Sequence, residues 1–300
     1  MDFDLLVVGD ANPDVIVAGA PRAPAFGQRE QLVESGRLTL GGSGAITACG
    51  AARLGLRTAF TGRVGDDAAG WFVLGELTQR DVDVSGCVVE AGAGGTALTV
   101  VLTDGHDRAI LTAPGCLDRL TVADITAGVT VRTHHVHVSS YFLQPRLAGD
   151  LAAYFASTEA TTSLDTNDDP SGAWKGLDDV LAVTGYFLPN DREARHITGV
   201  TDLERAAREL AARGTTPVIK CGADGALAYA DGELVRVPAA PAAVVDAVGA
   251  GDSFNAGFLA ARAKGLDVRR SLEVAVRAGT LSTRAAGGTA AQATWEEATS

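Results

Sequence analysis

Long hydrophobic runs are missing from this sequence of 300 residues. A helix that crosses a bilayer needs about 20 consecutive apolar residues. The first four residues, Met1-Asp2-Phe3-Asp4, are also not a basic segment ahead of an apolar one, as a secretion signal would be. We therefore expect a cytoplasmic protein that has no membrane partner.

Cysteine and lysine are scarce, and each scarcity excludes a class of site. The four cysteines show no C-x-x-C spacing, so we predict neither a zinc site nor a disulfide framework. The lysines are only Lys175, Lys220 and Lys264, and the formal net charge is −12. Nucleic acid is excluded as a partner because Lys and Arg bind its phosphates. A small anionic ligand would depend on backbone amides, a few basic side chains and a metal ion.

Several catalytic and nucleotide-binding motifs are absent as well. No glycine directly precedes a lysine, so there is no Walker-type phosphate loop, and Gly9 begins no G-x-G-x-x-G segment after the first strand. His134, His135 and His137 suggest a metal, but only two of them share a strand face and no third ligand is near in sequence. We expect ordinary histidines at a strand.

What is present is an alternation of apolar strands with small-residue helices, at 46% hydrophobic residues and 36 glycines. This alternation predicts an α/β fold, a doubly wound sheet of Rossmann-like type, as a single domain over residues 1–300. Strands are expected at 4–9, 136–140, 162–167, 183–190 and 216–220, a strand with its exit loop at 58–67, and helices at 45–54 and 68–80.

Residues 14–42 and 96–115 differ from this pattern. They contain short β-rich runs at 14–18, 31–34, 37–40, 96–102 and 108–112, with Gly or Asp turns between them. We predict a small β-sheet that stands off the main domain as a lid over the strand ends.

The stretch from Asp246 to Phe254 is the most informative part of the chain. Gly249, Ala250 and Gly251 lie between an apolar segment and a helical run, where backbone amides and a helix N-terminus can bind an anion. Asp252 beside them suits a base that takes a proton from a hydroxyl attacking a phosphate. The alternative is a glycine-rich turn with Asp252 as a helix cap.

Polar residues follow several predicted strands, where ligands of open α/β sheets bind. Asn12 and Asp14 follow the first strand and suit the hydroxyls of a polyol, and Asp165 and Asn167 are expected to be exposed at the same rim. Asn-Pro-Asp is equally consistent with a simple turn.

A second group of residues suits a nucleotide and its metal. Asn190 and Glu193 are one helical turn apart, so they are consistent either with a hydrated magnesium ion or with a helix cap. Glycines at 222 and 225 either let the backbone approach a nucleotide or form a hairpin turn. The break at Gly287-Gly288 is expected to return a loop toward the adenine.

Five segments, taken in order, resemble the ribokinase (PfkB) family of carbohydrate and nucleoside kinases, and the resemblance covers roughly residues 4–290. They are Asn12-Pro13-Asp14, Gly41-Gly42, residues 190–194, residues 222–225 and residues 246–254. The resemblance implies a Rossmann-like domain with a β lid. It implies that Asp252 is the base, that Gly249, Ala250 and Gly251 form the anion hole, and that ATP and Mg²⁺ are required. It also implies that the sugar is bound by Asn12, Asp14, Gly41, Gly42, Ser43, Ile46, Asp165 and Asn167. It implies that ATP is bound by Asn190, Glu193, Lys220, Gly222, Ala223, Asp224 and Gly225. Glu193 would bind Mg²⁺ through a water molecule.

Two further expectations come from the same resemblance. A K⁺ ion held by the Asp246 carboxylate and the Val248 carbonyl would fix the loop that leads into the anion hole. A homodimer through the lid is the expected assembly.

The chain departs from the family pattern at the substrate side. Ile46 replaces an asparagine, which favours a nucleoside or a deoxygenated sugar, and Ala247 replaces a threonine. Asp168 and Asp169 stand where a Tyr-Arg pair is usual, so an acid sugar would be repelled.

We therefore expect ATP-dependent phosphorylation of a hydroxymethyl group on a neutral sugar. The alternatives are an adenosine-like nucleoside kinase, a non-catalytic sugar or nucleotide sensor, and, from the α/β alternation alone, a dinucleotide-dependent dehydrogenase.

Overall fold

The apolar runs of both halves of the chain form one central sheet. The structure is a computed structural model that describes residues 2–92, 94–105, 107–127 and 132–300. Within them, nine strands are arranged in the order β15-β14-β13-β12-β11-β10-β1-β4-β6, and all neighbours from β13 to β6 are parallel. The strands of this sheet are β1 (Phe3–Val8), β4 (Thr58–Thr61), β6 (Val82–Asp83), β10 (Thr133–Val138), β11 (Thr161–Leu164), β12 (Tyr186–Phe187), β13 (Thr216–Lys220), β14 (Ala226–Ala230) and β15 (Glu233–Val237).

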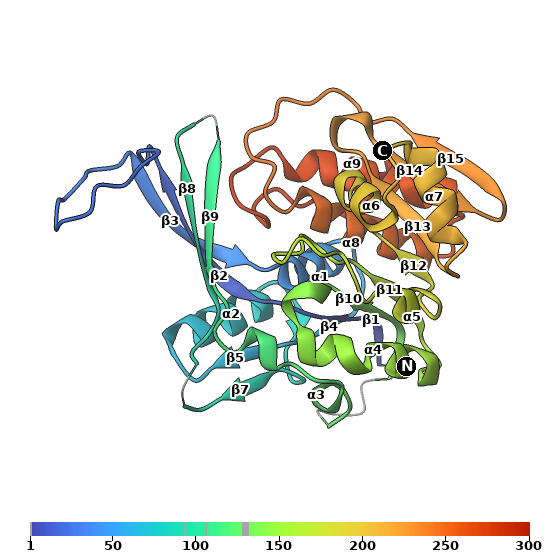
Figure 1. Ribbon diagram of the computed structural model, residues 1–300, viewed down its shortest axis with the longest axis horizontal. Helices are drawn as coiled ribbons and strands as arrows, with labels where there is room; N and C mark the ends of the chain where they lie inside the picture. Colours follow the sequence, from blue (N-terminus) through green and yellow to red (C-terminus); the bar gives the residue numbers. More distant parts are fainter. Residues whose placement is uncertain (1, 93, 106, 128–131) are drawn as a thin grey trace.

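Helices cover both faces of the sheet (Figure 1). Leu5 and Val7 of β1 pack on one face with α1, α2, α8, α9 and α10, and Leu6 and Val8 pack on the other face with α3 to α7. Because β1 is buried on both faces, it is a continuous apolar run. The helices are α1 (Ser43–Arg53), α2 (Ala68–Thr78), α3 (Val122–Ala127), α4 (Pro145–Ser157), α5 (Asp178–Leu181), α6 (Asp191–Thr198), α7 (Leu203–Ala211), α8 (Ala250–Ala263), α9 (Val268–Ser282) and α10 (Trp295–Thr299), with short 3₁₀ turns at η1 (Leu117–Arg119), η2 (Tyr141–Leu143) and η3 (Gly222–Asp224).

The strand order reverses at β1. The chain runs outward from β1 to β4 and β6 on one side, and from β10 to β13 on the other. Such a reversal opens a crevice beyond the carboxyl ends of the strands, and ligands of doubly wound sheets bind there. The predicted α/β architecture is confirmed, and this crevice is where the functional residues are to be sought.

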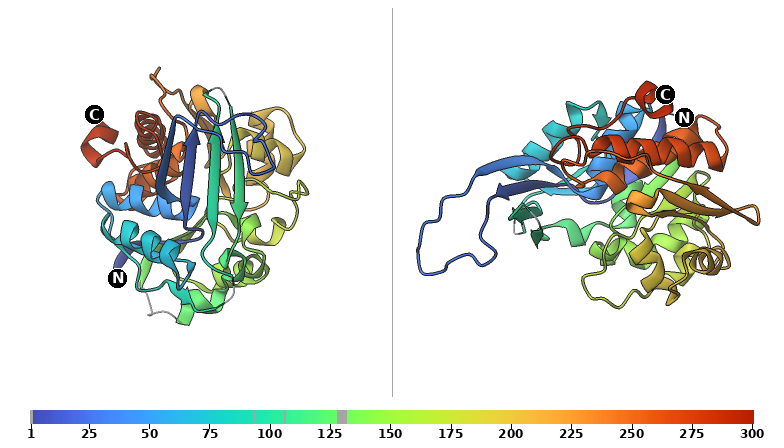
Figure 2. Two further views of the ribbon diagram at one scale, coloured as in Figure 1. Left: turned by 90° about the vertical axis from the view of Figure 1, so that its left-hand side faces the viewer. Right: turned by 90° about the horizontal axis from the view of Figure 1, so that it is seen from above.

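A second sheet stands off the central sheet (Figure 1). It contains β3 (Ser35–Gly41), β2 (Asn12–Ala18), β8 (Leu98–Thr103) and β9 (Arg108–Ala113), in that order. The prediction of a small sheet built from the segments 14–42 and 96–115 is confirmed, although residue 106 of the second segment lies outside the described residues. Figure 2 shows the same four strands from two further directions.

One local prediction was wrong. Residues 31–34 are not a strand: the pairing of β2 with β3 ends at Ala18 and Ser35, and no strand of the described residues pairs with 31–34. In the segment 58–67, predicted as a strand and its exit loop, β4 ends at Thr61, and residues 63–65 form β5 (Arg63–Gly65), which pairs with β7 (Val88–Glu90) in a separate small sheet. None of the described helices has the length and apolar character to cross a bilayer.

Candidate active site

The glycine-rich stretch lies at a loop-to-helix junction, as predicted. Gly249 is the N-cap of α8, and Asp252 lies in the first turn of that helix with 7% of its surface exposed. Burial raises the pKa of the Asp252 carboxyl to about 8; the nearby Asp165 adds to this rise and Lys220 opposes it. The deprotonated form of a carboxyl with such a pKa is basic enough to accept a proton from a reacting hydroxyl.

Gly249 cannot be replaced without moving the loop. Its φ is +72°, and a Cβ built on it would lie 2.6 Å from Cα of Gly288. The Gly287-Gly288 segment therefore packs against the loop that contains Gly249. Asp246 joins the two segments, since its carboxylate accepts the backbone N–H groups of Val248 at 3.0 Å and Gly287 at 2.9 Å.

Asn12 and Asp14 lie where the first strand leads into the lid. The Asn12 amide donates to Oδ1 of Asp14 at 2.7 Å and to the Thr99 hydroxyl at 3.1 Å. Burial raises the pKa of Asp14 to about 6, although the Asn12 hydrogen bond opposes the rise. Gly41 lies opposite, where a Cβ would come 2.1 Å from Oδ1 of Asp14, so only glycine leaves room for this carboxylate.

A buried aspartate that sequence reasoning missed fixes the next turn. Asp10 accepts the backbone N–H groups of Ser43 and Gly44, each at 3.0 Å, and the Ser140 hydroxyl at 2.8 Å. Gly42, at φ +89°, passes so close that a Cβ would lie 2.7 Å from the carbonyl oxygen of Asp10. The place of Asp10 directly after the first strand was the signal that could have revealed it.

Asn167 reaches this same turn from the other side of the crevice. Its amide donates to the hydroxyls of Ser43 at 2.6 Å and Ser140 at 2.7 Å. The structure thus brings together Asn12, Asp14, Gly41, Gly42, Ser43 and Asn167 as polar groups around the start of α1.

Asp165 was expected to be exposed at the rim, and this is wrong. Its side chain is 1% exposed and forms an ion pair with Lys220, with Nζ 2.6 Å from Oδ2. The Asn255 amide donates to the same oxygen at 2.6 Å. Asn255 was missed because it belongs to the middle of α8, three residues after Asp252, where nothing in the local sequence marks it.

Ile46 is buried, with 3% exposed, and lies close to Gly249 and Gly288. A Cβ at Gly288 would come 2.4 Å from its Cδ1, and one at Gly249 would come 3.1 Å from its Cγ2. The apolar side chain that we predicted at the sugar wall therefore packs against the Gly249 loop and the Gly287-Gly288 segment.

Asn190 and Glu193 form a capping box at the start of α6. The Asn190 backbone N–H donates to Oε2 of Glu193 at 2.8 Å, and the Glu193 N–H donates to Oδ1 of Asn190 at 2.8 Å. Burial, followed by the charge of Asp165, raises the pKa of Glu193 to about 7. The helix-cap alternative is thus realised, while the same carboxylate lies in the crevice near Lys220.

Gly251 also lines a cavity of about 550 Å³. Four of the predicted nucleotide-binding residues line it as well, namely Lys220, Gly222, Ala223 and Gly225. Its walls are otherwise mostly apolar or small side chains that sequence reasoning did not assign, among them Ala239, Pro241, Val244, Ala247, Phe254, Val276 and Thr280. Apolar walls with a few polar groups at one end suit a flat base linked to a phosphate chain.

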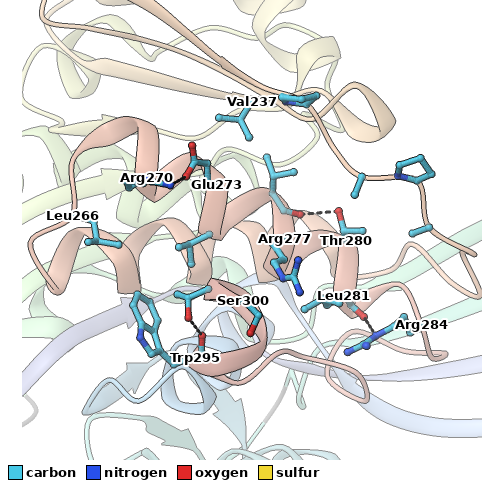
Figure 3. Close-up of a pocket in the computed structure, with 18 of the residues that line it drawn as sticks. Val237, Leu266, Arg270, Glu273, Arg277, Thr280, Leu281, Arg284, Trp295 and Ser300 are labelled. Carbon is cyan, nitrogen blue, oxygen red and sulfur yellow. Dashed lines mark hydrogen bonds and ion pairs between the residues drawn. The ribbon is translucent and has the colours of Figure 1, made fainter.

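A second cavity has a volume of about 930 Å³. Figure 3 shows it along α9 and α10, where it is lined by Arg270, Arg277 and Trp295. None of the predicted site residues lines it, so its size alone does not make it the active site.

Two of the three strand histidines form hydrogen bonds with hydroxyl side chains of the central sheet and its edge. His135 is hydrogen-bonded to Thr161 and Ser163, and His137 to Ser163 and Ser139. Burial lowers the pKa of His135 to about 3 and that of His137 to about 4, so both are neutral. Among the described residues, no three His, Cys, Asp or Glu side chains are grouped so that they could hold a metal ion.

Comparisons with known proteins agree with this geometry. The family model described as "pfkB family carbohydrate kinase" matches residues 2–295. A fructokinase of Klebsiella pneumoniae is 31% identical over 275 residues, which cover 87% of this chain and 84% of that protein.

Two solved structures share the fold. An Arabidopsis thaliana ribokinase with ribose and ATP has a TM-score of 0.84, 23% identity, and coverage of 99% and 98%. A structure from E. coli with ATP and Mg²⁺ has a TM-score of 0.86, 21% identity, and coverage of 98% and 97%. The chain belongs to the pfkB family of carbohydrate kinases, which are ATP-dependent phosphotransferases.

Proposed function

We propose that this kinase transfers the γ-phosphoryl group of ATP to a hydroxymethyl group of a neutral sugar, within one domain over residues 1–300 whose lid sheet covers the crevice. The observation that carries the proposal is the position of Asp252. This buried carboxyl, with a pKa of about 8, lies in the first turn of α8, where it is hydrogen-bonded to Ser43, the residue after Gly42. Its neighbour in sequence, Gly251, lines the cavity of about 550 Å³.

The roles of the residues follow from this position. Asn12, Asp14 and Asn167, with the amides near Gly42, orient the sugar. Asp252 takes the hydroxyl proton as the oxygen attacks the γ-phosphorus, and the bond from phosphorus to the ADP oxygen breaks. The amides of the Gly249 to Gly251 turn stabilise the charge on the transferred group.

Glu193 is the residue that would hold Mg²⁺, by way of water. Mg²⁺ in kinases is bound by one or two carboxylates together with the substrate phosphates, and it keeps several waters. The oxygens of the buried Glu193 carboxyl already accept hydrogen bonds from the backbone N–H and the side-chain amide of Asn190. This carboxyl therefore suits contact with the waters around Mg²⁺, and not a closed cage of protein ligands. When bound, the metal neutralises charge on the phosphates.

Release of ADP tests this function. The protein is incubated with ATP, Mg²⁺ and, one at a time, pentoses, hexoses, nucleosides and acid sugars. ADP release stimulated by a neutral sugar supports the proposal, and release only with nucleosides favours the adenosine-like alternative. Binding of ATP and sugar without any stimulated release would instead indicate a sensor.

Ile46 gives a prediction about substrate preference. Ile46→Asn should increase kcat/KM for ribose- or fructose-like sugars relative to the preferred compound, because an amide adds a hydrogen bond of about 0.5–1.5 kcal/mol. Ile46→Val is the apolar control and should leave the ratio unchanged. If the ratio does not move while the melting temperature falls, Ile46 serves only to support Gly249 and Gly288.

Potassium is proposed as an activating ion at Asp246 and Val248. The Asp246 carboxylate already joins the anion-hole loop to Gly287, so a bound cation would stiffen both segments. We expect a higher kcat in KCl than in tetramethylammonium chloride at equal ionic strength. Equal rates in the two salts would remove potassium from the proposal.

A homodimer through the lid is the proposed assembly. Three apolar side chains of the lid strands are more than half exposed, namely Leu38, Ile110 and Leu111. Light scattering should therefore give twice the chain mass of 30.6 kDa, and Leu111→Asp should shift the mass toward the monomer. A monomeric mass for the unmodified protein would contradict this assembly.

A further inference from the structure

A buried ion pair lies directly beside the proposed anion hole. Lys220 ends β13, and its side chain runs along Gly251, where a Cβ would lie 3.7 Å from the Lys220 ammonium nitrogen. The side chain is 12% exposed, and that of its partner Asp165 is 1% exposed. Removing two charges from water costs free energy that their attraction often does not recover, so a buried ion pair is weak evidence for a role in stability. A functional role is the alternative.

Two residues hold the ammonium group. Oδ2 of Asp165 accepts from Nζ at 2.6 Å, and Oδ1 of Asn255 accepts from it at 3.3 Å. Asn255 also donates to Asp165 at 2.6 Å, so the three side chains form a closed triangle. Asn255 lies one turn after Asp252 on α8, and both side chains therefore share a face of the helix.

The ammonium group has one donor left. It carries three N–H groups, and in the described part of the chain hydrogen bonds account for two of them. Lys220 also lines the cavity that we assign to the nucleotide. The charges of Asp165, Glu193 and Asp252 all favour the protonated form, and the pKa of Lys220 is raised in spite of its burial.

We propose that Lys220 contacts the phosphoryl group during its transfer, and that Asp165 and Asn255 are positioning residues that hold its ammonium group beside Gly251. This inference rests on the proposed function. As the bond from phosphorus to the ADP oxygen breaks and the bond to the sugar oxygen forms, the hydroxyl proton passes to Asp252. Lys220 keeps its own proton and supplies charge only. Asp165 thereby acts through Lys220 and does not touch the sugar.

The test is a double-mutant cycle with Lys220→Met and Asp165→Asn, assayed on the sugar that the unmodified enzyme phosphorylates. Lys220→Met should lower kcat by about 10²- to 10³-fold, as the loss of a group that stabilises transition-state charge does, and should change the sugar KM little. Asp165→Asn should lower kcat by about 10- to 100-fold through loss of a charge-assisted hydrogen bond. The double variant should be no slower than Lys220→Met alone, because Asp165 acts through the lysine.

The pH profile, with a matched control pair, separates positioning from a structural role. The acid limb of kcat/KM should move to higher pH in Lys220→Met and to lower pH in Asp165→Asn, because Lys220 lowers the pKa of Asp252 and Asp165 raises it. The exposed pair of Arg236 and Glu204, whose atoms lie 3.0 Å apart, is the matched control. Arg236→Met and Glu204→Gln should change neither kcat nor the pH profile.

If Lys220→Met does not fold because it leaves Asp165 unpaired, the double variant removes both charges and carries the test. A kcat near that of the unmodified enzyme in the lysine variant or in the double variant overturns the role of Lys220. A raised sugar KM with unchanged kcat in Asp165→Asn would show that Asp165 binds the sugar and does not position Lys220. An unmodified enzyme that transfers phosphate to no sugar refutes the proposed function, and this inference with it.

Discussion

Replacing Asp252 with asparagine is expected to lower kcat by about 10²- to 10⁴-fold, the range typical of removing a general base. The amide has nearly the same shape but cannot accept the hydroxyl proton. Because a base acts only in the transition state, the affinity for ATP should change little. Initial rates of ADP formation, together with calorimetric titration of ATP, measure both quantities.

The same substitution should change the pH dependence of the reaction. The base works when deprotonated, and its pKa is raised to about 8, so kcat/KM of the unmodified enzyme should rise with pH up to that value and then level off. In Asp252→Asn this rise of kcat/KM with pH, the acid limb of the profile, should be absent. Near-normal turnover, or an unchanged acid limb, would remove Asp252 from the role of base.

The stability of this variant provides its control for folding. A carboxyl whose pKa is raised on folding binds more protons in the folded state, so it makes stability fall as pH rises from about 4 toward 8. Asparagine removes this effect. The melting temperature of Asp252→Asn at pH 8 should therefore be no lower than that of the unmodified protein, so a loss of activity cannot be assigned to unfolding.

The second large effect is expected from Gly249→Ala. Alanine at φ +72° is disfavoured by about 1–2 kcal/mol, and its Cβ would lie 2.6 Å from a backbone atom of Gly288 that cannot swing away. The loop must shift, and the amides of the anion hole shift with it. We expect kcat to fall by about 10²- to 10³-fold, as for the loss of one oxyanion donor.

Gly75→Ala is the matched control for this loss. Gly75 lies inside α2, has an ordinary helical φ, and a Cβ there would have no neighbour within 4 Å. Alanine should therefore stabilise the helix by about 0.5–1 kcal/mol and leave the kinetics unchanged. If Gly249→Ala keeps both its kcat and its melting temperature, the loop is not the anion hole that we propose.

Much of the architecture could be predicted from the sequence because its signals are local. The apolar run of β1 is visible in adjacent residues, and the β-rich composition of the two lid segments predicts short strands there. The glycine spacing before Asp252 likewise predicts a turn that opens a helix, and α8 begins there. Strand and helix types, and the end of the sheet that holds the polar residues, were thus determined by the sequence itself.

The partners of the buried charges were decided only by the tertiary structure. Asp165 meets Lys220 across 55 residues and Asn255 across 90, and Gly287 meets Asp246 across 41. A sequence shows that a carboxylate follows a strand, but its surroundings depend on which strands become neighbours and how far the helices approach them. Whether that carboxylate faces solvent, a sugar or a lysine depends on packing between distant segments, and no local pattern encodes that packing.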